Sequence, residues 1–191
     1  DPCGLDAMVV RAPSLDEHFA AAGPKRILAL DGGGVRGILS LGFLQRMEEI
    51  LRERHGNDPA FRLSDYFDLI AGTSTGSIIA ALLAKGWVVA DVIALYLQLA
   101  EQVFSTHWWD PRGGILRPRY RPRDLSRLLR NVLGAEVTMG DPLQLRTGLL
   151  VMCKRIDTGS PWPISNNPKG HYFLSTPGEG TIANRDYKLW Q

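Results

Sequence analysis

The sequence of 191 residues is poor in several features that would narrow its function at once. Two cysteines, Cys3 and Cys153, are too few for a disulfide framework. A net charge of +2 is too small to indicate nucleic-acid binding. No apolar stretch reaches the length of a membrane span, and the N-terminus lacks a signal-peptide pattern. We therefore expect a cytoplasmic protein that binds no nucleic acid, with peripheral contact to a membrane left open.

The remaining composition is that of an ordinary globular domain, with 45% hydrophobic and 22% charged residues. Cys153 lies in an apolar run at residues 148–153 and is predicted to be a small core residue. One basic cluster interrupts a proline-rich stretch and is either a solvated loop or a patch that meets anionic lipid headgroups. Its members are Arg112, Arg117, Arg119, Arg121 and Arg123.

Segments with strand and helix patterns alternate along the chain after a loose leader at residues 1–24. Short apolar runs predict strands, and apolar residues at helical spacing predict helices. The predicted strands are residues 26–30, 66–71 and 144–157. The predicted helices are residues 35–55, 75–85, a third N-capped by Asp91 and ending near 104, and a short one at 123–133; the rest is predicted as turns. This alternation predicts an α/β fold with a largely parallel sheet.

The first glycine-rich motif is residues 31–37 (Asp-Gly-Gly-Gly-Val-Arg-Gly), between the first predicted strand and helix. Glycines have no Cβ atom, so their backbone N–H groups can approach a ligand closely. The N-terminus of the following helix adds positive potential at the same place. The expected occupant is an anion, either a phosphate or the oxyanion that forms when an ester carbonyl is attacked.

The spacing of Gly32, Gly34 and Gly37 also matches a dinucleotide-binding fingerprint. That interpretation needs an acidic residue about 20 positions further on, at the end of a second strand. Residues 48–53 lie instead within the first long predicted helix. A kinase-type phosphate loop is also excluded, because no Gly-Lys-Ser/Thr follows. The context therefore argues against a nucleotide site.

The second motif, residues 72–76 (Gly-Thr-Ser-Thr-Gly), matches the G-x-S-x-G nucleophile elbow and lies between a predicted strand and helix. Gly72 and Gly76 relieve crowding in the sharp turn, which lifts the Ser74 hydroxyl clear of the backbone. The Thr75 N–H faces the same space and can donate to an oxyanion. Taken alone, a turn without chemistry remains an alternative. Together, the two motifs supply a nucleophile and oxyanion donors, so we predict that Ser74 is the nucleophile of a serine acyl hydrolase.

A serine nucleophile needs a base, and the choice in this sequence is narrow. His107 and His171 are the histidines that follow Ser74. His107 precedes two tryptophans in a predicted loop, and His171 has no evident catalytic setting, so we expect neither to be catalytic. No metal or cofactor is expected, because the chain offers no His/Cys/Asp cluster at ligand spacing.

The two motifs together resemble the patatin-like phospholipase family from about residue 25 to residue 85, and more loosely at residues 158–162 and 184–191. The resemblance implies a three-layer α/β fold with a mostly parallel central sheet flanked by helices. It also implies a lipid acyl hydrolase of the phospholipase A type, which cleaves fatty-acyl esters at a membrane surface through a Ser–Asp dyad without histidine.

By the same resemblance, the residues of the first motif acquire separate roles. Gly33 and Gly34 are the principal oxyanion donors, and Gly32 shapes the loop. Arg36 matches the basic position beside the loop, where it orients the loop or meets a lipid phosphate. On residue type alone, Arg36 is equally well explained as an exposed residue in the first turn of a helix.

One departure from the family pattern concerns the dyad aspartate, which in the family lies in a later Asp-Gly-Gly or Asp-Gly-Ala segment. No such segment follows Ser74 in this sequence, and neither Asp157 nor Asp186 fits the pattern. We interpret residues 25–191 as a patatin-like catalytic domain that is incomplete at its C-terminus. The alternative is a catalytically inactive patatin-like binding or regulatory module.

Overall fold

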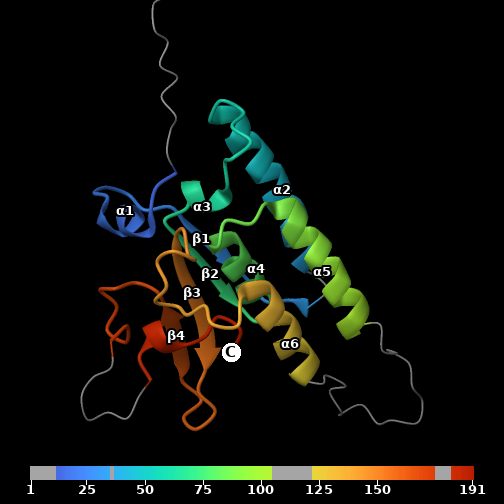
Figure 1. Ribbon diagram of the computed structural model, residues 1–191, viewed down its shortest axis with the longest axis vertical. Helices are drawn as coiled ribbons and strands as arrows, with labels where there is room; N and C mark the ends of the chain where they lie inside the picture. The colour runs from blue at the N-terminus through green and yellow to red at the C-terminus, as the bar shows by residue number, and fades with distance from the viewer. Residues whose placement is uncertain (1–11, 35–36, 105–121, 175–181) are drawn as a thin grey trace, which may run out of the picture.

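The computed structural model describes residues 12–34, 37–104, 122–174 and 182–191 (Figure 1). It has a four-stranded sheet in the order β1-β2-β3-β4 with helices around it. The strands are β1 Ile27–Leu30, β2 Leu69–Thr73, β3 Gly148–Lys154 and β4 Pro161–Ser165. The helices are α1 Leu15–Ala20, α2 Gly37–Arg54, α3 Leu63–Tyr66, α4 Thr75–Ala84, α5 Val89–Phe104 and α6 Pro122–Leu133, and the 3₁₀ helix η2 spans Asn184–Asp186. The predicted α/β fold is confirmed.

The sheet is mostly parallel, because β1 pairs parallel with β2 and β2 parallel with β3, whereas β4 is antiparallel to β3. In this register Leu30 pairs with Gly72, and Gly72 pairs with Val151. The carboxyl ends of β1 and β2 therefore meet at one edge of the sheet, where ligands bind in open α/β folds. Both glycine-rich motifs follow these two strand ends.

The hydrophobic core lies on the face of the sheet that α4 covers. Leu30, Ile70 and Leu149 point to this face from three neighbouring strands and are buried. Helix α4 itself is buried nearly all round, as expected for a helix that crosses the interior. The nucleophile elbow is therefore fixed at one end to a helix that is largely buried.

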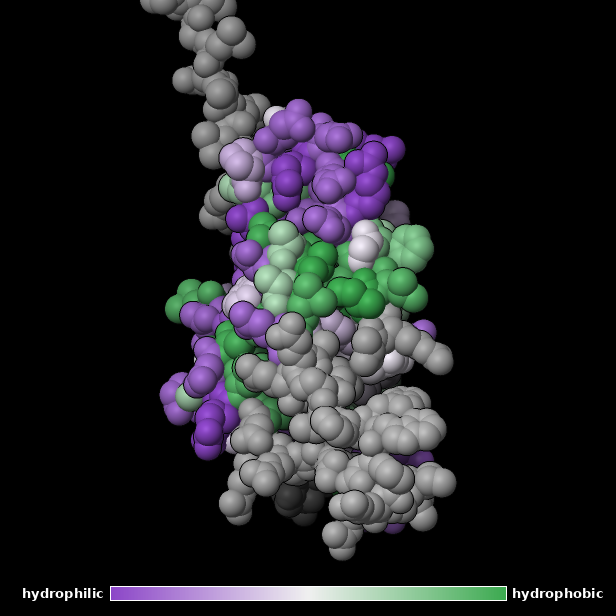
Figure 2. Space-filling view, turned by 90° about the vertical axis from the view of Figure 1, so that its right-hand side faces the viewer, coloured by the Kyte–Doolittle hydropathy of each residue, from purple (hydrophilic) through white to green (hydrophobic). Residues whose placement is uncertain are grey.

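The opposite face of the sheet is less covered by the described residues. Its side chains alternate with those of the core face, and Ile27 and Met152 on it are 60% and 39% exposed. Helix α1 covers one end, where a Cβ atom on Gly148 would lie 3.2 Å from Phe19 Cζ. Apolar side chains also gather on the side of the molecule that carries α2 and α5 (Figure 2), and there Phe43 is 77% exposed.

Part of the predicted loose leader is a helix. Ser14 and Glu17 form a reciprocal capping box at the start of α1, with the Ser14 N–H donating to Glu17 Oε2 over 2.6 Å. His18 of α1 is buried, and its Nδ1 lies 3.0 Å from Asp68 Oδ1. Burial acts to raise the pKa of Asp68, but hydrogen bonds from His18 and from the Arg26 backbone N–H outweigh it and hold this pKa below its usual value.

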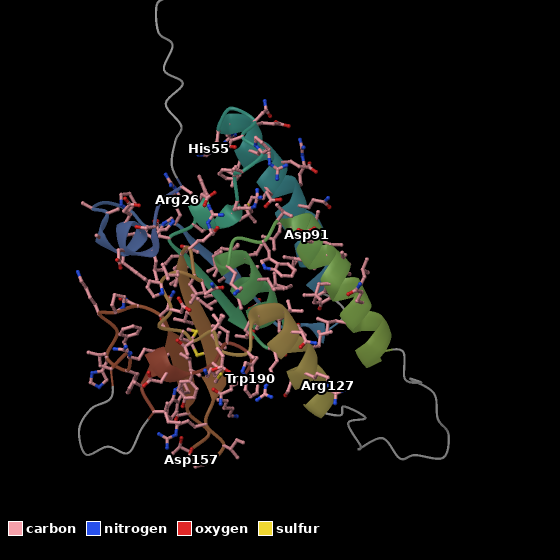
Figure 3. All side chains as sticks on the ribbon, in the orientation of Figure 1. Arg26, His55, Asp91, Arg127, Asp157 and Trp190 are labelled. Atoms are coloured by element: carbon pink, nitrogen blue, oxygen red, sulfur yellow. The ribbon has the colours of Figure 1, made fainter. Side chains whose placement is uncertain are left out.

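Most predicted elements are present, with corrected boundaries. Tyr66, predicted to begin the second strand, ends helix α3, and the strand begins at Leu69. Asp91 does not cap α5: it lies in the first turn of a helix that begins at Val89, near the upper end of α5 in Figure 3. The Val89 N–H donates instead to the buried Glu48 carboxylate of α2, over 3.3 Å.

The long predicted strand at residues 144–157 is shorter than expected and is followed by a strand that the sequence did not indicate. β3 ends at Lys154, a turn closes with the Arg155 N–H donating to the Ser160 carbonyl, and β4 returns antiparallel. The prediction that Cys153 is a core residue is wrong, because burial decreases along β3 and the last three residues of the strand, including Cys153, are exposed.

Asn166, directly after β4, ties that strand to β3 and yields a test of the fold. Its side chain is 2% exposed, accepts from the Leu149 N–H over 2.7 Å and donates to the Thr147 carbonyl over 3.1 Å. We expect Asn166→Ala to lower the free energy of unfolding by about 2–4 kcal/mol, because two buried backbone groups lose their partner. Urea denaturation measures this change. Asn167→Ala, at a half-buried neighbour, is the control, and an equal loss in both variants would contradict the assignment.

Candidate active site

Ser74 lies at the sharp turn between β2 and α4 and has an unusual backbone conformation. Its φ of 51° and ψ of −125° fall in a region that residues other than glycine rarely adopt. The side chain is exposed and makes no capping hydrogen bond with the helix. The Ser77 N–H donates to the Ser74 carbonyl over 3.0 Å and helps hold the turn. Strain of this kind is typical of functional positions held by rigid surroundings.

The two glycines of the elbow are required by neighbouring backbone. A Cβ atom on Gly72 would lie 2.6 Å from the Ser77 Cα, inside the first turn of α4. A Cβ atom on Gly76 would lie 2.8 Å from the Asp31 carbonyl oxygen. Backbone atoms cannot move aside as the end of a flexible side chain can. The crowding expected at Gly72 and Gly76 is therefore real, and at Gly76 it comes from the end of β1 and the first residue of the first motif.

The glycine-rich loop and the elbow are held together by hydrogen bonds. The Gly32 N–H donates to Thr73 Oγ1 over 2.8 Å, and the Gly33 N–H donates to Thr75 Oγ1 over 3.2 Å. A Cβ atom on Gly32 would lie 2.6 Å from the Ser74 Cβ. The structure thus brings the two motifs into contact around Ser74, although they are some forty residues apart in the sequence.

The backbone donors expected to form an oxyanion hole lie in this region. Gly34 has a φ of +54° and forms no N–H hydrogen bond with the described part of the chain. The Gly33 N–H already donates to Thr75 Oγ1, and this hydrogen bond would have to break before Gly33 could donate to an oxyanion. Thr75 begins α4, where the first backbone N–H groups have no partner within the helix. Arg36 lies outside the described residues, and Gly37 is buried at the start of α2.

A cavity of about 480 Å³ opens beside Ser74. Helices α4 and α6, strands β3 and β4 and the C-terminal residues enclose it, and its walls are mainly apolar. The apolar and aromatic lining residues are Ile78, Leu129, Leu133, Met139, Val151, Met152, Ile164, Tyr187, Leu189 and Trp190, with Cys153 also at the wall. Its volume lies within the range of small-molecule sites, roughly 300–1,000 Å³.

None of the described residues that line this cavity is a histidine, aspartate or glutamate. Asp157 lies at the tip of the turn between β3 and β4 (Figure 3), where Arg155 Nε donates to it over 2.9 Å. Asp186 Oδ1 lies 3.6 Å from Arg185 Nε, outside the cavity lining. His171 is exposed with its ring against Tyr172, and His107 is outside the described residues. The partner base of Ser74 thus remains a prediction from the family resemblance.

Several features of the site were not predicted from sequence. The Thr73 and Thr75 hydroxyls accept from the glycine-rich loop, and the buried Tyr96 hydroxyl donates to the Gly34 carbonyl. The threonines could have been noticed as hydroxyl residues on both sides of Ser74.

Of the basic cluster, only Arg123 falls within a described element, α6, and the other four arginines lie outside the described residues. In the described part of the chain, no group of three or more His, Cys, Asp or Glu could hold a metal ion.

Comparison with known proteins agrees with this arrangement. The family model for patatin-like phospholipase matches residues 28–175, which include both glycine-rich motifs and the whole sheet except the first residue of β1. The chain belongs to the patatin-like phospholipase family. Members of this family are lipid hydrolases, so the family relation supports serine acyl-ester hydrolysis at that level.

Individual relatives cover parts of the chain. Patatin-like protein 4 of Arabidopsis thaliana is 40% identical over 118 residues, which are 56% of this chain and 29% of the relative. The cGAMP-activated phospholipase of Vibrio cholerae is 30% identical over 169 residues, 83% of this chain and 46% of the relative. Probable inactive patatin-like protein 9 of Arabidopsis thaliana is 27% identical over 187 residues, 91% of this chain and 44% of the relative. The chain thus spans less than half the length of these relatives.

Among solved structures, the ExoU–SpcU complex of Pseudomonas aeruginosa matches at 21% identity and a TM-score of 0.42, covering 76% of this chain and 33% of that one.

The backbone strain at Ser74 can be measured directly. We expect Ser74→Gly to raise the free energy of unfolding by about 1 kcal/mol, because relief of roughly 1–3 kcal/mol of strain exceeds the entropic cost of glycine, about 0.5–1 kcal/mol. Ser126→Gly, within α6 and away from the elbow, is the matched control and should lower stability by about 1 kcal/mol. Urea denaturation of the three proteins decides the matter: a destabilised Ser74→Gly chain would show that the turn is unstrained.

Proposed function

We propose that the protein hydrolyses fatty-acyl esters of phospholipids, with Ser74 as the nucleophile. The observation that carries this proposal is the exposed, strained Ser74 in contact with a glycine-rich loop at the N-terminus of a buried helix. A nucleophile elbow needs a hydroxyl that is raised from the backbone and faces preorganised N–H donors. The membership of the family supports a lipid ester as the substrate.

In the proposed reaction, Ser74 Oγ attacks the ester carbonyl carbon while its proton passes to a base, an aspartate by resemblance to the family. The carbonyl oxygen becomes an oxyanion, which accepts hydrogen bonds from N–H groups of Gly33, Gly34 and Thr75. Loss of one such donor costs on the order of 3–4 kcal/mol in other serine hydrolases. As the tetrahedral intermediate collapses, the base gives its proton to the departing oxygen, so the lysolipid leaves as a neutral alcohol and an acyl-enzyme remains. Water then gives a proton to the base and attacks this ester, and the base returns the proton to Ser74 Oγ as the fatty acid leaves.

The cavity beside Ser74 supports an acyl chain as the group that is bound. Its apolar walls suit a hydrocarbon tail, which gains free energy by leaving water. The Vibrio cholerae relative is named as a phospholipase, which supports a phospholipid as the source of that chain. Among the described helices none is long and apolar enough to cross a membrane. We propose that the substrate is met at a membrane surface.

A second candidate is a patatin-like module that binds lipid or regulates a partner without catalysis. Two observations favour it: the absence of a carboxylate or histidine among the described residues lining the cavity, and the likeness to a relative named as probably inactive. Such a module would keep the fold and the glycine-rich loop. It would lack only the ability to remove the proton from Ser74.

Covalent labelling distinguishes these candidates. We expect an alkyl fluorophosphonate to modify Ser74 when the whole protein, including the segment that supplies the base, is treated, because an activated serine attacks phosphorus as it attacks a carbonyl. Peptide mass spectrometry identifies the modified residue. Ser74→Ala should lose the label, whereas Ser126→Ala, which removes a hydroxyl of α6 that does not line the cavity, should keep it. A wild-type protein left unlabelled, or labelled equally in the Ser74→Ala variant, would favour the inactive module.

The acyl-binding role of the cavity makes a separate prediction. Ile78 lies one helical turn after Ser74 and lines the cavity. We expect Ile78→Trp to slow labelling by a long-chain alkyl fluorophosphonate by about tenfold, since filling the pocket removes more than one buried methylene contact of the ligand. Labelling by the methyl analogue should be unchanged and serves as the internal control. Equal slowing of both reagents would place the alkyl chain elsewhere.

A further inference from the structure

A buried tyrosine reaches the glycine-rich loop from a helix that belongs to neither motif. Tyr96 lies in the middle of α5 and is 4% exposed. Its hydroxyl donates a hydrogen bond to the Gly34 carbonyl. A buried phenol needs a polar partner, and this carbonyl supplies it. The loop is therefore fixed from the side of α5 as well as from the elbow.

Gly37, the last glycine of the first motif, is explained by the same contact. A Cβ atom there would lie 2.9 Å from Tyr96 Cζ, and closer still to the hydroxyl oxygen. Any larger residue would push the phenol away from Gly34. The motif thus contains one glycine whose role is to admit a side chain of the protein itself, and no substrate contact is needed to account for it.

The position of Tyr96 is set by the packing of α5 against α2 (Figure 1). The first N–H of α5, from Val89, donates to the Glu48 carboxylate of α2. Glu48 is 4% exposed, and burial raises its pKa although Arg52 and the Val89 N–H act to lower it. These contacts fix the position of α5 along α2. They therefore also fix the position of the Tyr96 hydroxyl beside the glycine-rich loop.

We propose that Tyr96 is the positioning residue of the oxyanion-binding loop. By engaging the Gly34 carbonyl, its hydroxyl keeps this acceptor on the side of α5 and leaves the loop's N–H groups to face the oxyanion at Ser74. Three consecutive glycines have many accessible conformations, so a hydrogen bond from another element is needed to hold the loop in a single conformation. A carbonyl oxygen turned toward Ser74 would repel the oxyanion that the loop is meant to stabilise. The catalytic role of Tyr96 rests on the proposed function, whereas its hold on the loop does not.

The first test is kinetic and uses Tyr96→Phe, which removes only the hydroxyl. We expect the maximal rate of Ser74 labelling by an alkyl fluorophosphonate to fall by roughly 10–100-fold, because small misplacements of preorganised groups have effects of this size. The concentration of reagent that gives half the maximal rate should stay unchanged, since the apolar cavity does not contact Tyr96. Tyr66→Phe, which removes a phenol hydroxyl from α3, is the matched control and should label like the wild type.

The second test follows the loop itself. In ¹H–¹⁵N spectra, Tyr96→Phe should shift the amide signals of Gly32, Gly33 and Gly34 and speed their hydrogen exchange, while those of β2 and β3 stay unchanged. Unchanged loop signals would overturn the proposal, whatever the labelling rate. Shifted loop signals with wild-type labelling rates would also overturn it, because the hydroxyl would then not serve the reaction. If the wild type is not labelled at Ser74 but the loop signals shift in the variant, the proposed function fails and the hold of Tyr96 on the loop stands.

Discussion

The close approach of two backbone turns, one after β1 and one after β2, is the constraint on which the rest of this structure depends. Gly76 of the elbow lies so near the Asp31 carbonyl that no Cβ atom fits between them. Because β1 and β2 are parallel neighbours, their carboxyl ends deliver these turns to one point. The hydrogen bonds from Gly32 and Gly33 to the two threonine hydroxyls form only at this separation. The sheet register and the local glycines therefore fix the site together.

The strain at Ser74 follows from this constraint and from the burial of α4. A helix whose inner residues are almost wholly buried cannot shift along its axis to relax the turn before it. The φ of 51° at Ser74 is thus imposed by packing on one side and by the β1 turn on the other. A strained conformation persists only where its surroundings over-determine it. Here the surroundings are the core of the domain.

Local features of the sequence predicted the parts of this arrangement that local chemistry decides. The elbow at residues 72–76 was predicted because the strand, the glycines and the helix follow one another directly in the sequence. Helix α1 was missed although Ser14 and Glu17 carry a capping-box signal, because the helix is too short to show periodicity. Tyr96 could not have been predicted, since its importance comes from the packing of α5 on α2. The exposure of Cys153 likewise depends on how burial decreases along β3, which the apolar run at residues 148–153 does not show.

The geometry also separates two halves of the proposed chemistry. The nucleophile and its backbone donors belong to one closely packed unit, formed by the turns after β1 and β2 and by Tyr96. A base would have to come from another element, and nothing in the packing of this unit depends on it. A relative that lost the base would therefore keep the strained serine, the glycines of both motifs and the hydrogen bond from Tyr96 of α5. For this reason a family can contain both active and inactive members without a change of fold. Reactivity at Ser74, and not the shape of the elbow alone, distinguishes the two.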